Sequence, residues 1–276
     1  MMMDRRFRFG VIGGPDHTGA QWRELACRTE ELGYSTLLMP DGLSLLAPLP
    51  AAAVAASVTK TLRVGTFVLA STVRMPRTVA WEADSVAVLT DHRLELGIGT
   101  GNPWMNRAAV DELGMPETTP AQRLALVEQT VRHLRERETT AHTPVLIAAG
   151  GPRSRKLAGQ LADIVTPANH PLADRQEITR IVAEIDEAAG PRADRLEYLM
   201  NVLIVGDAIP RRLAPLAGDD ISALIAADSL SLLRGTPRQM ADEIQRRRDA
   251  FGFSYIAVNE LFIEQFAPVV ELLAGR

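Results

Sequence analysis

Short apolar runs alternate with amphipathic segments along the whole chain. The apolar runs are rich in Val, Ile, Leu and Phe, which is typical of strands that are covered on both faces. The segments between them repeat apolar residues every three or four positions, as in Val79, Ala83 and Val86, which predicts helices with one buried face. The predicted strands are Phe7–Ile12, Ser35–Met39, Leu62–Ala70, Arg93–Ile98, Val145–Ala149, Asp163–Thr166, Leu196–Val205 and Ser254–Val258. The predicted helices are Ala20–Leu32, Ala51–Val58, Thr78–Leu89, Pro120–Arg137, Arg153–Leu161, Arg175–Ala189, Pro237–Phe251 and Phe266–Ala274.

Eight strands that alternate with helices over 276 residues predict an α/β fold, the (β/α)₈ TIM barrel, as a single domain over residues 1–276. An open, doubly wound sheet is the alternative, because one sequence does not show whether the sheet closes. Gly10 lies in the first strand and Gly13 and Gly14 follow it, but Pro15 and Asp16 break the G-x-G-x-x-G pattern. A Rossmann dinucleotide site is therefore disfavoured.

The run from Val145 to Ala149 leads directly into Gly150 and Gly151, just before the helix predicted from Arg153. Glycines at a strand exit let backbone N–H groups approach a ligand, and a helix N-terminus favours an anion. These residues predict a phosphate or pyrophosphate at the carboxyl end of a parallel sheet. A tight turn with nothing bound explains the same residues equally well.

The composition narrows the possible partners. Hydrophobic residues make up 46% of the chain, which is enough for a substantial core. Thirty basic against 34 acidic residues give no electrostatic reason to expect nucleic acid as a partner. No apolar run reaches the roughly 18–20 residues that cross a membrane, and the start of the chain lacks a signal-peptide pattern. We therefore expect a cytoplasmic protein without a membrane partner.

Few side chains suited to catalysis follow the predicted strands. The active site of a TIM barrel lies at the carboxyl ends of its strands, and Asp41 is the only carboxylate directly at a central strand end. The histidines include no pair at metal-binding spacing, and Cys27 is the single cysteine, so we expect no metal site and no intrachain disulfide. His17 and His170 fall at the catalytic end, whereas His92 is expected to be structural and His133 to be a surface residue of a helix.

Four segments and the tail resemble the bacterial luciferase-like superfamily, in particular its actinobacterial branch that uses the deazaflavin coenzyme F420. The similar segments are Glu30–Asp41, Leu62–Leu69, Arg93–Gly101, Pro144–Gly151 and Leu233–Arg276. The resemblance covers nearly the whole chain. It implies a TIM barrel that holds F420, or alternatively FMN, at its carboxyl face and acts on a small-molecule substrate. It also implies a homodimer.

The resemblance assigns roles to individual residues. It implies a non-proline cis peptide near Phe67–Val68, behind the ring system of the cofactor. The loop after the fourth strand, together with Asn106, would flank the ring and its polyol, and the paired glycines would bind the phosphate. The implied cofactor-binding residues are Phe67, Val68, Thr100, Gly101, Asn106, Gly150 and Gly151. Asp41 and Asn102 are the predicted catalytic residues, because they can give polarity to the substrate or the ring.

Three features depart from the family pattern. Gly42 stands where many relatives place a histidine, and Asn102 stands where F420-dependent sugar-phosphate dehydrogenases carry a glutamate. Asparagine can hydrogen-bond but cannot take a proton. Only Glu138–Thr143 separates the fourth long helix from Pro144, whereas relatives carry an extended segment that commonly covers the pocket. With this shortened segment before strand five, we expect a more open site or one closed by another subunit.

Three functional hypotheses follow. The first is an oxidoreductase in which the cofactor carries a hydride, or activates oxygen if it is FMN, while the protein binds and orients. The second is a catalytically degenerate cofactor-binding barrel that acts as a carrier or subunit, which the missing histidine and glutamate would fit. The third, a phosphate-binding lyase or isomerase, needs a lysine or paired carboxylates at strand ends, and Lys60 and Lys156 are not so placed.

Overall fold

The strands of the chain close into a parallel barrel. The computed structural model describes residues 5–138 and 141–276. The strands are β1 (Arg8–Ile12), β2 (Thr36–Met39), β3 (Arg63–Thr66), β4 (Leu69–Ala70), β5 (Leu94–Gly99), β6 (Val145–Ala149), β7 (Ile164–Pro167), β8 (Glu197–Val202), β9 (Ile204–Val205), β10 (Leu232–Leu233) and β11 (Phe253–Asn259). The main sheet has the order β3-β2-β1-β11-β8-β7-β6-β5-β4, and an additional pairing of β3 with β5 closes it. Closure confirms the predicted TIM barrel over the open, doubly wound alternative.

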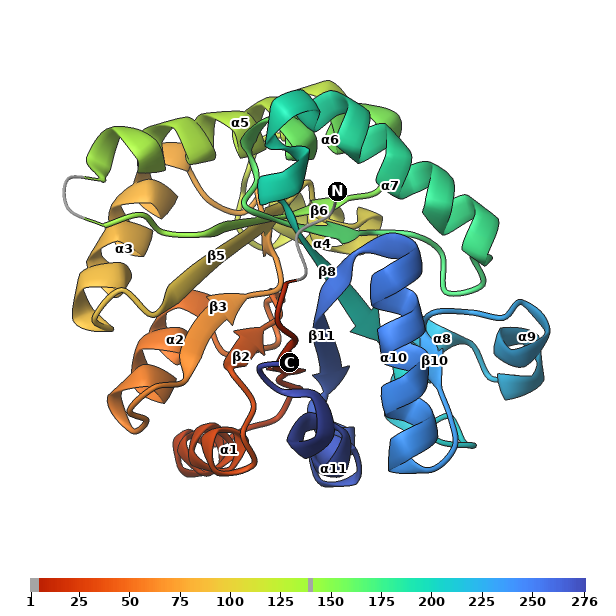
Figure 1. Ribbon diagram of the computed structural model, residues 1–276. Helices are drawn as coiled ribbons and strands as arrows, with labels where there is room; N and C mark the ends of the chain where they lie inside the picture. The colour runs from red at the N-terminus through yellow and green to blue at the C-terminus, as the bar shows by residue number, and fades with distance from the viewer. Residues whose placement is uncertain (1–4, 139–140) are drawn as a thin grey trace.

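Helices surround this barrel (Figure 1). The helices are α1 (Gly19–Glu31), α2 (Pro48–Ser57), α3 (Pro76–Leu89), α4 (Pro103–Asp111), α5 (Pro120–Arg137), α6 (Pro152–Leu161), α7 (Arg175–Ala189), α8 (Ala214–Ala217), α9 (Ile221–Ala226), α10 (Pro237–Phe251) and α11 (Ile263–Leu273). Short 3₁₀ turns are η1 (Gly190–Arg195), η2 (Arg211–Leu213) and η3 (Glu260–Phe262). Many helices begin with proline, which suits the first turn because its missing N–H has no partner there. Within the described residues, no helix is both long and apolar enough to cross a membrane.

The eight predicted helices are all present, but two predicted strands are wrong in detail. The run Leu62–Ala70 forms two strands, β3 and β4, and the run Leu196–Val205 forms β8 and β9. Strand β9 leaves the barrel and pairs with β10 in a separate two-stranded sheet. Helices α4, α8 and α9 and strand β10 were not predicted. The unpredicted elements lie after β5 and after β8, at the carboxyl face.

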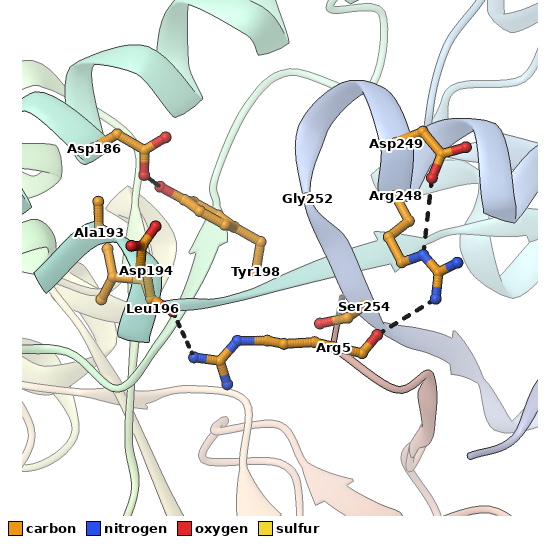
Figure 2. A pocket seen from close by; sticks show the side chains of 10 residues that line it. All are labelled: Arg5, Asp186, Ala193, Asp194, Leu196, Tyr198, Arg248, Asp249, Gly252 and Ser254. Carbon is orange, nitrogen blue, oxygen red and sulfur yellow. Dashed lines mark hydrogen bonds and ion pairs between the residues drawn. The ribbon is translucent and has the colours of Figure 1, made fainter. Parts of the chain in front are cut away.

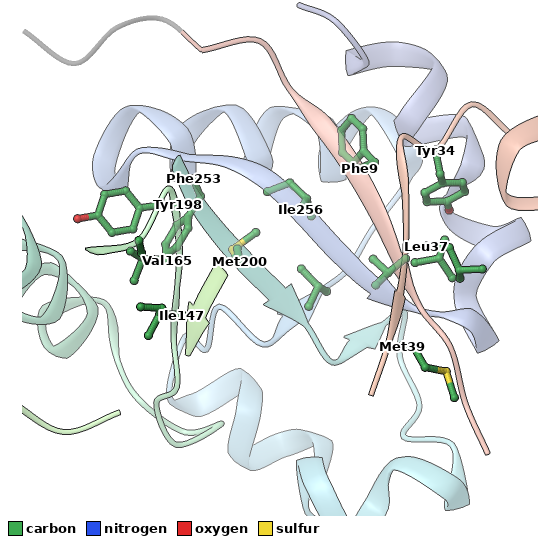
Figure 3. Close-up of a cluster of buried hydrophobic side chains, with 14 of the residues drawn as sticks. Phe9, Tyr34, Leu37, Met39, Ile147, Val165, Tyr198, Met200, Phe253 and Ile256 are labelled. Atoms are coloured by element: carbon green, nitrogen blue, oxygen red, sulfur yellow. The ribbon is translucent and has the colours of Figure 1, made fainter. Parts of the chain in front are cut away.

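Side chains alternate between the two faces of the barrel wall. Outward-facing residues such as Phe9, Leu37 and Ile256 belong to the large core between strands and helices (Figure 3). Inward-facing residues form a smaller cluster inside the barrel that includes Leu146 and Leu199. This two-residue period follows from the pleat of a strand, and it decides which side chains point toward a ligand in the barrel mouth.

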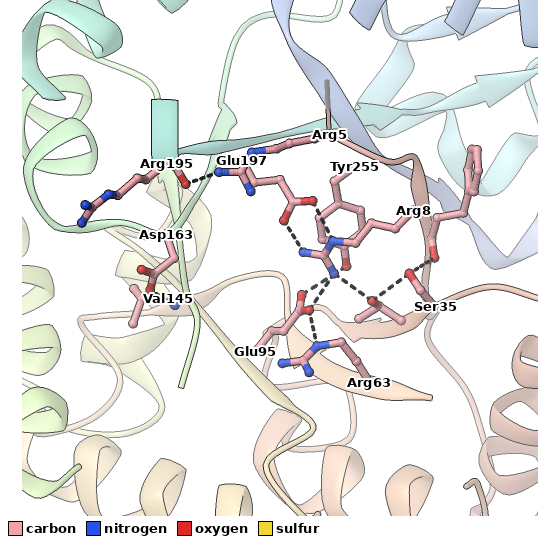
Figure 4. A network of polar contacts seen from close by, with 12 residues as sticks. Arg5, Arg8, Ser35, Arg63, Glu95, Val145, Asp163, Arg195, Glu197 and Tyr255 are labelled. Carbon is pink, nitrogen blue, oxygen red and sulfur yellow. Dashed lines mark hydrogen bonds and ion pairs between the residues drawn. The ribbon is translucent and has the colours of Figure 1, made fainter. Parts of the chain in front are cut away.

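A charged network fills the amino end of the barrel (Figure 4). Arg8 donates to Glu197 and to Glu95, and Arg63 also donates to Glu95. The Arg8 guanidinium lies 3.5 Å from the centre of the Tyr255 ring. Burial alone would raise the pKa of Glu95, but Arg8 and Arg63 outweigh it and hold that pKa below its usual value. The network plugs this end, so the ligand-accessible end is the opposite one.

The short connection between α5 and β6 also lies at the amino end. The backbone N–H of Thr143 donates to Glu138, and Arg135 pairs with Asp163, which directly precedes β7. Residues 139 and 140 of this connection lie outside the described residues. Its described ends join the end of a helix to the start of a strand at the amino end of the barrel. The expectation of a more open site, or of one closed by another subunit, stays a prediction.

Candidate functional site

The wall of the barrel is interrupted between β3 and β4. There the Thr66 hydroxyl donates to the carbonyl oxygen of Gly97 at 2.7 Å and accepts from the N–H of Gly97 at 2.9 Å. The side chain thereby replaces the usual backbone ladder, and the next peptide, Phe67–Val68, turns toward the barrel mouth. This peptide is cis, as the family resemblance implied.

Two glycines of β5 make room for this interruption. A Cβ on Gly97 would lie 1.9 Å from the Thr66 carbonyl oxygen, and one on Gly99 would lie 2.9 Å from Val68 Cγ2. Real Cβ atoms do not approach other atoms this closely, so a side chain at position 97 would require the backbone to move, and one at position 99 would displace the Val68 side chain. The Leu-Gly-Ile-Gly pattern of β5 therefore explains how the Phe67–Val68 segment reaches the interior.

A pocket adjoins this segment because β7 and β8 separate at their carboxyl ends. Within the described strands they pair at Ile164 with Glu197 and at Val165 with Tyr198, and the pairing stops there. Beyond that point a cavity of about 200 Å³ opens. Its lining residues are Phe67, Val68, Ala148, Thr166, Pro167, Ala168, Asn169, Ile178, Leu199, Met200, Asn201, Leu203, Leu230, Ser231 and Phe253. We call this cavity the β7/β8 pocket.

The outer wall of the β7/β8 pocket comes from the chain between β8 and α10. Leu203, Leu230 and Ser231 line the pocket from this side. Ser229 holds the segment in place through a hydrogen bond from its hydroxyl to the carbonyl oxygen of Pro171. This segment, which contains α8, α9 and β10, therefore forms part of the pocket wall.

Asp41 is buried in an ion pair. Its carboxylate accepts two hydrogen bonds from the Arg74 guanidinium, at 2.6 and 3.0 Å, and one from the N–H of Ala70 at 2.9 Å. The Asp41 side chain is 2% exposed and that of Arg74 is 22% exposed. Asp41 thus fixes the end of β4 and orients Arg74, and both of its carboxylate oxygens are already paired.

The loop after β5 is held by its own polar groups. The loop consists of Thr100, Gly101 and Asn102. The Asn102 side chain caps α4 by accepting from the N–H of Met105 at 2.7 Å. The Asn106 amide oxygen accepts from the Thr72 hydroxyl, and its nitrogen donates to the carbonyl oxygen of Gly101. The structure thus brings Gly101 and Asn106 together, beside β4, and uses Asn102 as a helix cap.

In the turn after β6, side chains bond to the backbone, and the space beside Gly151 is open. The N–H of Gly151 donates to the Ser154 hydroxyl at 3.0 Å, and that hydroxyl donates back to the Gly151 carbonyl. Arg155 donates to the Gly150 carbonyl and pairs with Glu184. A Cβ on Gly151 would meet nothing within 4 Å. The space beside the Gly151 Cα is therefore open, whereas its N–H is already used within the turn.

Asn201 is a pocket residue that sequence reasoning missed. Leu199 belongs to the cluster inside the barrel, and Asn201, two residues further along β8, lines the pocket. Its side-chain oxygen is buried and has no hydrogen-bond partner among the described residues. The available signal was one amide in an apolar strand at an inward position of the two-residue period.

His17 and His170, which were expected at the catalytic end, make contacts within the loops there. His17 Nε2 lies 2.7 Å from Glu260 Oε2, which also accepts from the N–H of Gly14. His170 Nδ1 accepts from the N–H of Leu172. Neither histidine lines the β7/β8 pocket. Among the described residues, no group of three His, Cys, Asp or Glu side chains could hold a metal ion.

A second cavity, of about 360 Å³, lies at the amino end of β8 and β11 (Figure 2). Tyr198 donates to Asp186 at 2.7 Å there, and Arg5 donates to the carbonyl oxygen of Arg195. This cavity is on the far side of the charged network from the carboxyl face. Since TIM-barrel sites are built from the loops after the strands, we place the candidate site in the β7/β8 pocket and the loops around it.

The fold and this site define a TIM-barrel protein of the luciferase-like type. The model of the luciferase-like monooxygenase family matches residues 6–211, and the chain belongs to that family. This confirms the family resemblance of the sequence.

Among its relatives is the F420-dependent glucose-6-phosphate dehydrogenase of Nakamurella multipartita, which is 25% identical over 234 residues, 72% of this chain and 68% of the relative. The protein of the same name from Amycolatopsis mediterranei is 29% identical over 174 residues, and the chain spans about half of its length, with 51% of this chain and 50% of the relative matched.

Solved structures of similar fold include two F420-dependent enzymes. The F420-dependent tetrahydromethanopterin reductase of Methanopyrus kandleri matches with a TM-score of 0.71 and 16% identity, over 98% of this chain and 99% of that one. An F420-dependent secondary alcohol dehydrogenase, in complex with an F420–acetone adduct, matches with a TM-score of 0.74 and 15% identity, over 98% of both chains. At these identities the likeness shows the fold.

Proposed function

We propose that the protein is an oxidoreductase that binds F420, with FMN as the alternative, and uses it on a small organic substrate. The observation that carries the proposal is the Phe67–Val68 segment, which the Thr66–Gly97 bonds hold beside the β7/β8 pocket. The names of the two curated relatives support F420 as the cofactor. A single domain, a cytoplasmic location and the absence of a nucleic-acid partner stay predictions from the sequence.

The residues at the carboxyl face fit such a cofactor. Phe67 and Val68 offer an apolar surface to a flat ring. Thr100 and Gly101 lie in the neighbouring loop, and Asn106 of α4 holds that loop through the Gly101 carbonyl. The open space at Gly151, beside Gly150, suits a phosphate at the α6 N-terminus. When bound, F420 would supply two-electron hydride transfer, and FMN would also permit monooxygenation.

In this proposal the side chains bind, orient and exclude water. Asp41 acts as a positioning residue, because its carboxylate holds Arg74 at the edge of the site. Asn102 acts through α4, whose first turn it caps. Since neither is poised to exchange a proton, most of the chemistry falls to the cofactor.

The alternative is a degenerate cofactor-binding barrel, which would bind the cofactor without catalysing a reaction. The paired state of Asp41 and the capping role of Asn102 leave both predicted catalytic residues occupied. Binding of F420 without turnover of its reduced or oxidised form in a substrate screen would favour this alternative.

The proposal is tested by titrating the protein with F420 and, separately, with FMN while following cofactor fluorescence and absorbance. We expect one cofactor to bind with a micromolar or lower Kd. Gly151→Asp should raise that Kd at least about tenfold, because it places a carboxylate at the phosphate position. Gly19→Asp at the start of α1 is the matched control and should change the Kd less than about twofold. Failure of both cofactors to bind would overturn the proposal.

We further propose that the protein forms a homodimer through the outer face of α2 and α3. Helix α3 exposes Trp81 at 58%, Val88 at 62% and Leu89 at 76%, and Val54 of α2 and its C-cap Val58 are also exposed. Exposed apolar patches often mark protein–protein interfaces. Trp81→Glu combined with Val88→Asp should shift the mass measured by light scattering to that of a 30.0 kDa monomer. A wild-type protein that is already monomeric would contradict this prediction.

A further inference from the structure

One arginine is buried against the outer wall of the β7/β8 pocket. Arg247 lies in α10, which runs alongside β10 (Figure 1), and its side chain is 3% exposed. Its guanidinium donates to the carbonyl oxygens of Leu230 and Leu232, each at 2.8 Å, and its Nη1 lies 3.5 Å from the sulfur of Met200. Leu230 and Met200 line the pocket, as does Ser231. Because a buried charge is costly unless it is hydrogen-bonded, the wall is stabilised where it satisfies this guanidinium.

The two carbonyl groups depend on Arg247 because of the alternation along a strand. Successive carbonyl groups of an extended segment point to opposite sides. Those of Ser231 and Leu233 accept from backbone N–H groups in and just after β9. The alternate pair, of Leu230 and Leu232, accepts from Arg247 on the side of α10. Both residues are buried, so removal of the guanidinium would take the donor from two carbonyl oxygens that water does not reach.

A shared carboxylate links Arg247 to a second arginine that holds the same segment. Glu243, one turn earlier in α10, accepts from Arg247 at 2.8 Å and from Arg175 at 2.7 Å. Arg175, the first residue of α7, also pairs with Asp228, which directly precedes residues 229–233. We call residues 229–233 the wall segment. Arg175 thus fixes its start and Arg247 fixes its length, with Glu243 as the common counter-charge.

We propose that Arg247 is a positioning residue for the cofactor, which fixes the wall segment and thereby sets how fast a bound cofactor leaves the β7/β8 pocket. This inference rests on the proposed function, because the same pocket is lined by Phe67 and Val68, which that function assigns to the cofactor. A wall segment without its donor moves more freely and contacts the ligand less. Since changes at a binding surface act mainly on dissociation, the effect is expected in the dissociation rate.

The test compares three substitutions in the full-length protein. Arg247→Met keeps a long apolar side chain but removes every donor. Arg247→Lys keeps the charge beside Glu243, but a single ammonium group does not reproduce the planar, forked contact of a guanidinium. Arg246→Met is the matched control, because Arg246 pairs with the same carboxylate from the surface, where its side chain is 65% exposed.

Two readouts separate the wall segment from the cofactor. Hydrogen–deuterium exchange of the cofactor-free protein, followed by mass spectrometry, reports on the wall segment, and the fluorescence change on dilution of the cofactor complex reports on dissociation. Arg247→Met should accelerate exchange in the wall segment and cofactor dissociation at least about tenfold each, while peptides of β1 exchange as in wild type. Arg247→Lys should lie between Arg247→Met and wild type, as a partial rescue. Arg246→Met should stay within about twofold of wild type in both readouts.

The outcomes distinguish this inference from the proposed function. Unchanged exchange in the wall segment of Arg247→Met would overturn the inference, and so would equally faster exchange in β1, which marks a general loss of stability. If the wall segment exchanges faster but cofactor dissociation is unchanged, Arg247 does not position the cofactor, and the proposed function stands. If neither F420 nor FMN binds to the wild-type protein, the proposed function itself fails. Should Arg247→Met not fold, Arg247→Lys compared with Arg246→Met decides the same question.

Discussion

Replacing Gly97 with alanine is expected to lower the free energy of unfolding by about 3 kcal/mol and to abolish cofactor binding. The new Cβ would lie 1.9 Å from the carbonyl oxygen of Thr66, which is backbone and cannot rotate away. Relief requires β3 and β5 to separate, and that breaks the two buried hydrogen bonds between Thr66 and Gly97. Urea unfolding and a cofactor titration measure the two effects.

Two further variants decide whether the effect belongs to this contact. Gly19→Ala, where the nearest atom would be 3.6 Å from the new Cβ, should leave both stability and binding near wild type. Thr66→Val keeps the shape of the side chain but removes its hydroxyl, and should cost about 2 kcal/mol. A Gly97→Ala protein with normal stability and normal cofactor affinity would show that the interruption between β3 and β4 is not held as described.

The barrel itself could be predicted from the sequence because the same alternation of apolar strands and amphipathic helices is repeated along the chain. Each buried strand and amphipathic helix carries its own period, and α7 was predicted to the residue from one clear apolar stripe. Helix α4 was missed although Asn102 and Pro103 form a regular helix start. Helix α9, with six residues, is too short for a period to be visible.

The site was less predictable because it consists of departures from those periods. In the sequence Thr66 is an ordinary strand residue. Only the structure shows that its hydroxyl makes two hydrogen bonds to the Gly97 backbone in place of backbone–backbone bonds. The position of the Phe67–Val68 peptide came from the family resemblance and not from the pattern of residues. Asp41 was correctly predicted at the carboxyl end of the second strand. Nothing in the sequence shows, however, that its carboxylate forms an ion pair with Arg74.

Replacing Glu95 with glutamine is expected to lower the free energy of unfolding by about 3–5 kcal/mol at pH 7. The Glu95 side chain is 2% exposed and accepts from Arg8 and Arg63, each at 2.6 Å. A neutral amide would leave these guanidinium groups without their shared counter-charge. Glu264→Gln is the control, because its pair with Arg28 is exposed and screened by solvent, so its loss should change stability little.

The same pair of proteins gives a pH dependence of known sign. Burial opposes ionisation of Glu95, but Arg8 and Arg63 hold its pKa in the folded state below its usual value. Its contribution is therefore complete above the unfolded-state pKa of about 4.3 and is lost as the pH falls through the lower folded-state pKa. Urea unfolding at pH 7, 5 and 3 should show a constant difference between wild type and Glu95→Gln down to pH 5 and a smaller one at pH 3. If the stability difference between wild type and Glu95→Gln instead grew as the pH fell, the network would not favour the ionised carboxylate. The amino end would then not be closed by a charged network, and the argument that ligands enter at the carboxyl face would lose its support.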